Sequence, residues 1–423
     1  MITDRVIHRK LEVITPTRRV VTGIIFLVIG FAIWFLFAYH VNPKDVAVFG
    51  LNPGGSTAIL PNWYVPVSVT LYFLSALCGL FGMIQIVRGF KRWTNRILSL
   101  IITFFVFSFL VWATAGKSLN LAGLIVITLG RSVPLTLGAI SGILCERAGV
   151  VNIAIEGMML MGAMVACMVG SASNSLWLGL LSGIAAGMLL ATVHAVLSIK
   201  YKTNQIISGT VINILAVGLT SYLSQKFLQV YQVELNSPPL FPSFAIPVLS
   251  DIPLIGPIFF KANIFVYAMY LALIIVTIAL FYTRWGLRMR AVGEHPKAAD
   301  TLGINVFKTR YISVLLGGAI AGLAGSYFTL ASVGRFDPKM TNGRGFIALA
   351  AMIFGNWTPI GSFGAGLLFG FAESLDKGVQ ILNVGIPSEF LLMAPYIVTM
   401  VILAGVVGRS VAPAADGVPY EKE

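Results

Sequence analysis

Long apolar runs separated by short polar loops dominate this sequence. A helix needs about 20 apolar residues to cross the hydrocarbon core of a bilayer, which is about 30 Å thick. The pattern therefore predicts an all-α, polytopic membrane bundle. The runs that reach this length, or nearly reach it, are Val20 to Tyr39, Val65 to Val87, Ile97 to Ala115, Leu176 to Ile199, Gln205 to Leu223, Asn263 to Tyr282, Tyr311 to Ala331 and Phe390 to Val407.

Two further apolar regions, 121–170 and 345–374, are interrupted by polar stretches. The first contains Cys145-Glu146-Arg147-Ala148-Gly149, and the second contains Gly355-Asn356-Trp357-Thr358-Pro359 between runs of about 10 to 12 residues. We interpret the first region as two crossings and the second as a hairpin that enters and leaves from one side. This gives about 10 spans plus a re-entrant hairpin. If 345–374 were a single crossing instead, the C-terminus would lie on the opposite side.

Basic residues are concentrated in the loops of one side. With this topology, the loops on the side of the N-terminus hold 20 of the 29 Lys and Arg residues, and the other side holds 8. Lys and Arg are enriched in cytoplasmic loops. We therefore expect a multi-pass protein of the plasma (inner) membrane with both termini in the cytoplasm.

Composition agrees with this class and excludes others. Hydrophobic residues make up 57% of the chain and charged residues only 11%, whereas about a quarter of a soluble domain is charged. The formal charge of +13 could indicate nucleic-acid binding, but the basic residues lie mostly in short loops. Cys78, Cys145 and Cys167 lie in or beside apolar runs, so we interpret them as small core residues and expect no metal site.

No motif predicts bond-making chemistry. The sequence contains no HExxH and no acidic pair with metal-ligand spacing, so we expect no catalytic residues and no cofactor. The stretch Ala115-Gly116-Lys117-Ser118 resembles the end of a phosphate-binding loop, but Val111 stands where that motif needs glycine. Energy from ATP would therefore have to come from a partner protein.

The cytoplasmic loop 283–310 contains the signals of a short helix. Pro296 suits the first helical turn, the residues from Lys297 to Leu302 can continue it, and Gly303 suits a left-handed stop. So short a helix needs support from neighbouring helices or from a partner. It could transmit a partner's motion, or the loop could be a basic surface segment that only sets topology; spacing leaves both open.

Several polar residues lie inside the apolar regions. Asn152 and Glu156 are four residues apart and share a helix face. A carboxylate costs about 2.5 to 3.5 kcal/mol in the bilayer centre on insertion scales, so Glu156 should either line a route or brace a broken helix. Pro134, three residues after Arg131, suggests that a surface helix or a half helix ends nearby. His194 is typical of a satisfied polar residue, although a proton site remains an alternative.

Glycines spaced by four indicate faces where helices pack closely. They are Gly179, Gly183 and Gly187, then Gly318 and Gly322, and finally Gly366 and Gly370.

Four stretches resemble a known family, and they occur in that family's order between about residues 119 and 407. The family comprises the permease subunits of nucleoside and simple-sugar ABC importers, related to the ribose and branched-chain amino-acid permeases. The stretches are PLTLGAISGILCERAGVVNIAIEGMMLMGA (134–163), NQIISGTVINILAVGLTSYL (204–223), GLRMRAVGEHPKAADTLGIN (286–305) and GFIALAAMIFGNWTPIGSFGAGLLFG (345–370).

This resemblance implies the ABC importer permease fold, transport of a nucleoside or a related simple sugar, and several partners. These are a cytoplasmic ATPase, a second permease subunit that is often non-identical, and an extracytoplasmic substrate-binding lipoprotein. It implies a coupling helix that contacts the ATPase, at Gly293, Glu294, His295, Pro296, Lys297, Ala298, Ala299, Asp300 and Gly303. Residues expected to line the translocation route are Asn152, Glu156, Asn204, Asn213 and Asn356.

The chain departs from this family before residue 119. Residues 1–118 add three membrane spans, 119–410 form the permease core with its coupling loop 283–310, and 411–423 form a polar tail that we expect to lack fixed structure. The competing hypothesis is an ion-coupled secondary transporter of a small polar solute, with Glu156 or His194 as its proton site.

Overall fold

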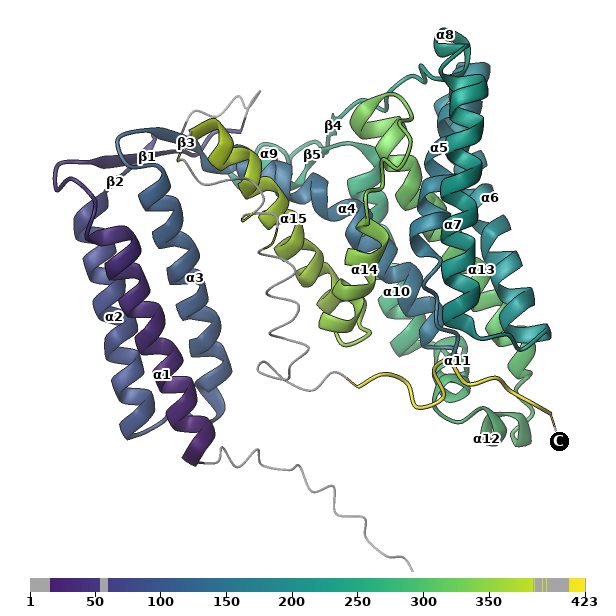
Figure 1. Cartoon of the computed structure of the whole chain (residues 1–423), viewed down its shortest axis with the longest axis horizontal. Helices are drawn as coiled ribbons and strands as arrows, with labels where there is room; N and C mark the ends of the chain where they lie inside the picture. The colour runs from purple at the N-terminus through teal and green to yellow at the C-terminus, as the bar shows by residue number, and fades with distance from the viewer. Residues whose placement is uncertain are drawn as a thin grey trace, which may run out of the picture. The chain divides into compact units, whose positions relative to one another are not determined.

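A computed structural model describes residues 16–53, 60–382, 384, 390, 393 and 411–422 of the chain (Figure 1). Within these residues, nine helices are long and apolar enough to cross a membrane. They correspond to the predicted spans between Val20 and Ala331, and the polytopic helical fold is confirmed. The last predicted span, Phe390 to Val407, lies almost entirely outside the described residues.

The chain divides into two compact units, and the first comprises residues 1–123 and 378–386. Two of its helices, α1 and α2, lie close enough for the Ser75 hydroxyl to donate a hydrogen bond to the Gly30 carbonyl oxygen at 2.8 Å. In its small sheet, β1 pairs antiparallel with β2 and parallel with β3. Its elements are α1 (Pro16–Ala32), η1 (Ile33–Ala38), β1 (Val46–Gly50), β2 (Trp63–Pro66), α2 (Val67–Val87), η2 (Lys91–Trp93), α3 (Thr94–Ala113) and β3 (Ser118–Asn120).

The second unit comprises residues 124–377 and 387–423. Its elements are α4 (Leu121–Glu146), α5 (Ile155–Ser173), α6 (Leu176–Ala195), η3 (Val196–Lys200), α7 (Gln205–Leu223), η4 (Ser224–Leu228), α8 (Gln232–Leu235), β4 (Phe244–Ala245), α9 (Ile255–Phe259), β5 (Lys261–Ala262), α10 (Ile264–Tyr282), α11 (Arg284–Glu294), α12 (Pro296–Thr301), α13 (Val306–Tyr327), η5 (Phe328–Val333), α14 (Arg344–Phe354) and α15 (Pro359–Leu382).

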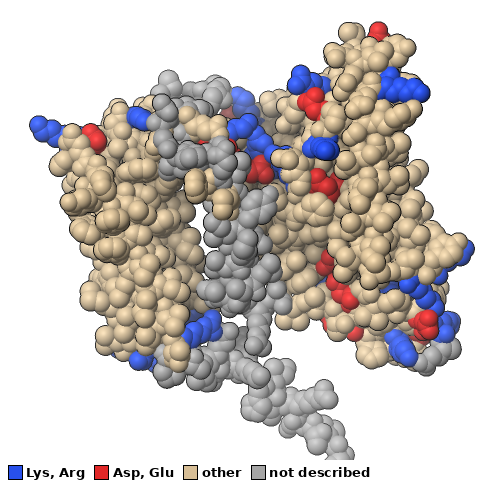
Figure 2. All heavy atoms as spheres, in the orientation of Figure 1, with Lys and Arg blue, Asp and Glu red and all other residues tan. Residues whose placement is uncertain are grey.

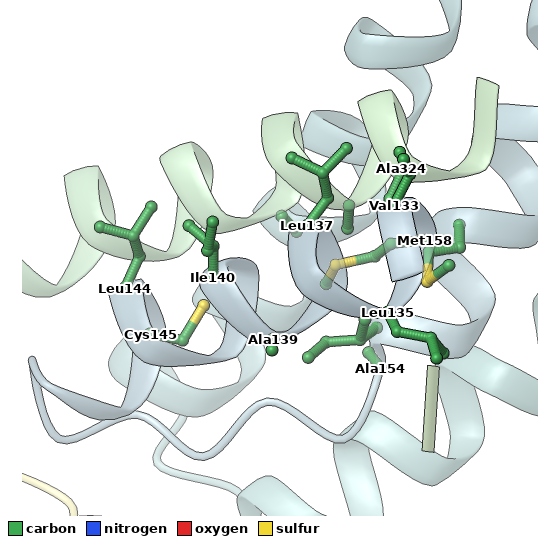
Figure 3. Packing of buried hydrophobic residues seen from close by; sticks show 14 of the residues in the cluster. Val133, Leu135, Leu137, Ala139, Ile140, Leu144, Cys145, Ala154, Met158 and Ala324 are labelled. Carbon is green, nitrogen blue, oxygen red and sulfur yellow. The ribbon is translucent and has the colours of Figure 1, made fainter. Parts of the chain in front are cut away.

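Helix α5 lies at the centre of this unit, packed against α6, α7 and α13. Glycines permit the close approach: a Cβ atom placed on Gly162 would lie 2.8 Å from the Cα of Gly322, and one on Gly187 would lie 2.7 Å from the same atom. The predicted glycine faces are thus confirmed as packing faces for α6 and α13. Figure 3 shows the adjoining core, to which Leu137 and Ile140 of α4, Met158 of α5 and Ala324 of α13 all contribute.

Helix α4 is continuous through Pro134, so the predicted helix end near Arg131 is wrong. A proline in a membrane helix is tolerated when neighbouring groups satisfy the freed carbonyl. The interruption predicted from the polar stretch at Cys145 to Gly149 is present. It lies between Glu146 and Ile155, where the chain turns from α4 into α5. The interpretation of 121–170 as two helices is confirmed.

The hairpin at 345–374 differs from expectation in its second arm. Helix α14 has 11 residues, or about 16 Å, while α15 has 24, or about 36 Å. Helix α15 therefore continues well beyond the second apolar run, into a polar part that includes Glu373 and Asp376, and it is not among the nine helices that are long and apolar enough to cross a membrane. The turn is tight, with left-handed backbone at Asn356 and Trp357, and the Trp357 indole donates to Glu146 Oε2 at 2.6 Å. This bond places the turn at the Glu146 end of α4.

The polar tail is also ordered, contrary to expectation. Ala415 donates its backbone N–H to the Gly293 carbonyl oxygen at 2.9 Å, and Tyr420 is only 5% exposed. In the second unit, charged atoms gather near the ends of the helices, among them the end that carries α11, α12 and the tail (Figure 2).

Candidate functional site

Glu156 holds the N-terminus of the short helix α14. The side chain is 7% exposed; its Oε1 accepts from the Thr341 hydroxyl at 2.6 Å and the Gly343 N–H at 2.9 Å, and its Oε2 accepts from the Gly345 N–H at 2.6 Å. The first N–H groups of a helix have no partner within the helix, and the helix dipole favours a negative charge there. Of the two roles left open by the sequence, bracing a broken helix accounts for these contacts.

Asn213 and Asn152 hold the chain between α4 and α5. Asn213 Oδ1 accepts from the Gly157 N–H at 2.8 Å, and its Nδ2 donates to the Ile153 carbonyl at 2.9 Å. Asn152 is fully buried, and its Oδ1 accepts from the Ala154 N–H at 3.1 Å. These amides satisfy backbone groups at the start of α5, and thereby help to place Glu156.

His194 is similarly engaged. Its Nε2 lies 2.9 Å from the Val151 carbonyl oxygen, and its Nδ1 lies 3.2 Å from the Ser208 hydroxyl oxygen. Both ring nitrogens therefore have hydrogen-bond partners, as expected for a structural polar residue.

The other two route candidates are exposed and cap turns. Asn204 is the N-cap of α7, where its Oδ1 accepts from the backbone N–H of Ile206 at 3.0 Å and of Ile207 at 3.2 Å. Asn356 Oδ1 accepts from the Val411 N–H at 3.1 Å. The structure thus brings Asn152, Glu156 and Asn213 together, and places Asn204 and Asn356 at surface turns.

A charged cluster joins three helices near the middle of α4. Glu373 Oε2 of α15 lies 3.1 Å from Arg344 Nη2 of α14 and 3.7 Å from Arg131 Nη1 of α4. Arg131 lies about 15 Å along α4 from Leu121, and its side chain is 30% exposed against 13% for Glu373. One carboxylate faces two guanidinium groups, so the cluster has an excess of positive charge.

Sequence reasoning found only one member of this cluster. Arg131 stood out as an odd residue, but its partners are more than 200 residues away, and no local spacing connects them. A search for all ionisable residues within apolar helices would have found Arg344 and Glu373 as well.

The predicted short helix at Pro296 is confirmed. Helix α12 has six residues with Pro296 in its first turn, His295 Nδ1 accepts from the Ala298 N–H at 3.1 Å, and Gly303 has φ of +79°. Ala299 is buried, while Glu294, His295, Lys297 and Ala298 are exposed, as is Leu302 at 80%. One face of this segment is therefore exposed, and the other is packed.

Gly293 packs the segment against the α4–α5 connection, because a Cβ atom there would lie 2.9 Å from the Arg147 carbonyl carbon. Arg147 in turn donates to the Trp357 carbonyl at 3.1 Å. Burial lowers the pKa of Arg147, although it remains a cation. The segment that begins at Gly293, the α4–α5 connection and the α14–α15 turn thus share one end of the unit.

Among the described residues, no group of three or more His, Cys, Asp and Glu could hold a metal ion. The three cysteines are buried and unpaired.

Comparison with known proteins gives several matches. NupQ of Bacillus subtilis, a guanosine ABC transporter permease protein, is 42% identical over 306 residues, which cover 70% of this chain and 95% of that protein. NupC of Lactococcus lactis, a nucleoside ABC transporter permease protein, is 43% identical and covers 69% and 94%. TsgC13 of Haloferax volcanii, a putative glucose ABC transporter permease protein, is 39% identical and covers 63% and 80%.

The first two organisms each contribute a second, less similar match, also named as a guanosine or nucleoside ABC transporter permease. No solved structure matches. The sequence model of a family described as the permease component of branched-chain amino acid transport systems matches residues 124–407, and the chain belongs to this family of ABC transporter permeases.

Proposed function

We propose that this chain forms part of the translocation pathway of an ATP-driven importer for nucleosides, with a related simple sugar as the alternative substrate. The observation that carries the substrate class is the similarity along about 70% of the chain to permeases named for guanosine and nucleosides. The glucose permease match keeps the sugar open. The chain performs no hydrolysis itself, and ATP is consumed by a separate ATPase.

The segment from Gly293 to Gly303 is the proposed coupling helix. It offers an exposed face for a cytoplasmic ATPase, and its buried face rests on the α4–α5 connection and on α13. An ATPase that moves this segment would therefore move the α4–α5 connection and the start of α5 that follows it. Glu156 lies at this start and holds the N-terminus of α14. If this segment faces the cytoplasm, the proposed topology puts both termini in the cytoplasm as well.

A second permease subunit and an extracytoplasmic substrate-binding lipoprotein complete the proposed assembly. The second subunit is expected to be a paralogue, because two organisms each have two matching permeases. In this assembly the receptor would select the substrate, and the permease would provide the route.

The coupling proposal is tested by reconstituting the permease with these partners in proteoliposomes. The Gly293→Asp, Pro296→Asp double variant should lose guanosine uptake, because a side chain at Gly293 meets the Arg147 backbone and Asp at 296 removes the proline that starts α12. Normal uptake by this variant would count against the assignment. Glucose uptake measured in parallel decides between the two substrate classes.

The rival function, an ion-coupled transporter, has less support from the geometry. Both carboxylate oxygens of Glu156 and both ring nitrogens of His194 already have protein partners. A proton site needs a group that can exchange its proton with a solvated route. Uptake that persists without the ATPase and stops when the proton gradient is collapsed would favour the rival.

The charged cluster of Arg131, Arg344 and Glu373 is proposed to line the translocation route. Ionisable residues within membrane helices almost always face the bundle interior or a water-filled cavity and often mark a substrate pathway, and the side chain of Arg131 is 30% exposed. Asn152, Glu156 and Asn213 then act as supports for α14 beside this route. The route assignments of Asn204 and Asn356 stay predictions.

Cysteine labelling tests this placement, because the native cysteines are buried. Arg131→Cys should react with a charged, membrane-impermeant thiol reagent, and guanosine should slow the reaction in the assembled importer. Ile127→Cys, one turn away on an exposed apolar position, should react with a lipophilic maleimide but poorly with the charged reagent. An Arg131→Cys thiol that reacts only with the lipophilic reagent would remove the cluster from the route.

Residues 1–118 are proposed to be an addition to a permease core at 119–410. Residues 1–123 belong to a different compact unit from most of the remaining chain, and the family match begins at residue 124. Deleting residues 1–118 should leave a core that still assembles with the ATPase. Loss of assembly would show that the added spans belong to the core.

A further inference from the structure

The polar tail, residues 411–422, contacts the α14–α15 turn and the end of α11 at one end of the second unit. Val411 binds Asn356 in the α14–α15 turn. Ala414 donates its N–H to Glu294 Oε2 at 3.2 Å, and Ala415 donates to the Gly293 carbonyl at 2.9 Å. The tail therefore runs from the hairpin turn to the coupling segment, and it lies beyond the region matched by the family.

A buried arginine anchors the middle of the tail. Arg310 of α13 is 1% exposed, and its Nη1 donates to the Val418 carbonyl at 3.0 Å. A Cβ atom on Gly149 would lie 2.9 Å from Arg310 Nη2 and 3.0 Å from the Ala415 carbonyl oxygen. The tail is thus packed against both α13 and the α4–α5 connection, with no room for a side chain at Gly149.

The end of the tail covers the inner face of the coupling helix. Tyr420 forms a small buried cluster with Val292 of α11, Ala299 of α12 and Val306 of α13. Its ring centre lies 5.3 Å from that of Phe307. Glu421 adds an ion pair with Lys202 at 2.7 Å, which should contribute little because both side chains are exposed to solvent.

We propose that residues 411–422 form a strap that fastens the coupling segment to the bundle, and that Tyr420 and Arg310 are positioning residues for coupling. The inference rests on the proposed function. A helix of six residues is not stable alone, so a coupling helix can transmit motion only if it is mounted on the parts that must move. The strap provides this mounting, because it joins α12 to the α4–α5 connection and to the hairpin turn.

The test measures uptake and ATP hydrolysis together in the complete reconstituted importer. Tyr420→Ala should lower the number of guanosine molecules imported per ATP by about threefold or more, while hydrolysis continues. Val418→Ala is the matched control, because it lies two residues away, its side chain is 50% exposed, and only its backbone holds Arg310. It should keep the wild-type ratio.

A second measurement removes the strap after folding. A specific protease site inserted between residues 410 and 411 allows the assembled importer to be cut and washed, and the import per ATP should fall as for Tyr420→Ala. An unchanged ratio in both experiments, or a higher ratio after the cut, would overturn the strap. Absence of ATP-dependent uptake by the wild-type importer would instead refute the proposed function, so the two failures are distinguishable.

Discussion

Replacing Glu156 by Gln tests whether this residue braces α14 or acts on the substrate. The carboxylate accepts three hydrogen bonds of 2.6 to 2.9 Å, and Gln keeps only one acceptor oxygen and turns an N–H₂ toward a donor. Hydrogen bonds to charged groups contribute about 1.5–3 kcal/mol each, and charge at a helix N-terminus adds about 0.3–1 kcal/mol. We therefore expect Glu156→Gln to destabilise the start of α14 by about 3 kcal/mol.

Hydrogen exchange of the permease in nanodiscs measures this effect locally. Because about 1.4 kcal/mol corresponds to a factor of ten, the amides of Gly343 and Gly345 should exchange about 100 times faster in the variant. Glu234→Gln is the control, because it makes the same chemical change on the exposed helix α8. If the exchange rates at α14 are unchanged while uptake is lost, Glu156 acts on the substrate and the bracing argument is refuted.

Further outcomes follow from other contacts. Gly345→Ala should lower the thermal unfolding temperature of the purified permease, because its Cβ would lie 2.5 Å from the Glu156 Cα; an unchanged temperature would contradict this packing. Trp357→Phe should cost roughly 2 kcal/mol in denaturant unfolding, because it leaves the buried Glu146 without its 2.6 Å indole partner; Trp357 variants as stable as wild type would show that this bond contributes nothing. Burial raises the pKa of Asp416 from 3.8 to about 7, so docking of the tail is favoured at low pH and weakens as the pH rises from about 4 through 7. Protease cleavage of the tail should therefore be faster at pH 8 than at pH 6, and Asp416→Asn should reduce this difference.

Local patterns were sufficient to predict the membrane helices and the short helix at Pro296. Apolar run length predicted the spans, since the bilayer thickness sets a minimum length. Pro296 and Gly303 predicted both ends of α12, because proline and glycine act on the backbone at their own positions. The glycines spaced by four predicted the faces on which α6 packs against α13 and α5, because a missing Cβ is a local property with a direct packing consequence.

Long-range pairing could not be predicted in the same way. Glu156 was recognised as a carboxylate that needs a partner, but that partner is a helix start almost 190 residues later, and period and spacing carry no information on it. Pro134 was misinterpreted because the break it usually signals is suppressed when other helices enclose the residue. The tail was wrongly predicted to lack fixed structure, because its composition is mostly polar. Composition does not show that a few of its residues, Tyr420 among them, are buried.

The measurement that tests the account most directly is guanosine uptake by proteoliposomes that contain the permease, its partner subunit, the ATPase and the receptor. Uptake should require ATP on the side of the ATPase and should continue when a protonophore collapses the proton gradient. Uptake that is undiminished without the ATPase, or that stops with the proton gradient alone, would contradict the claim that this bundle moves its substrate with work received through the helix at Pro296.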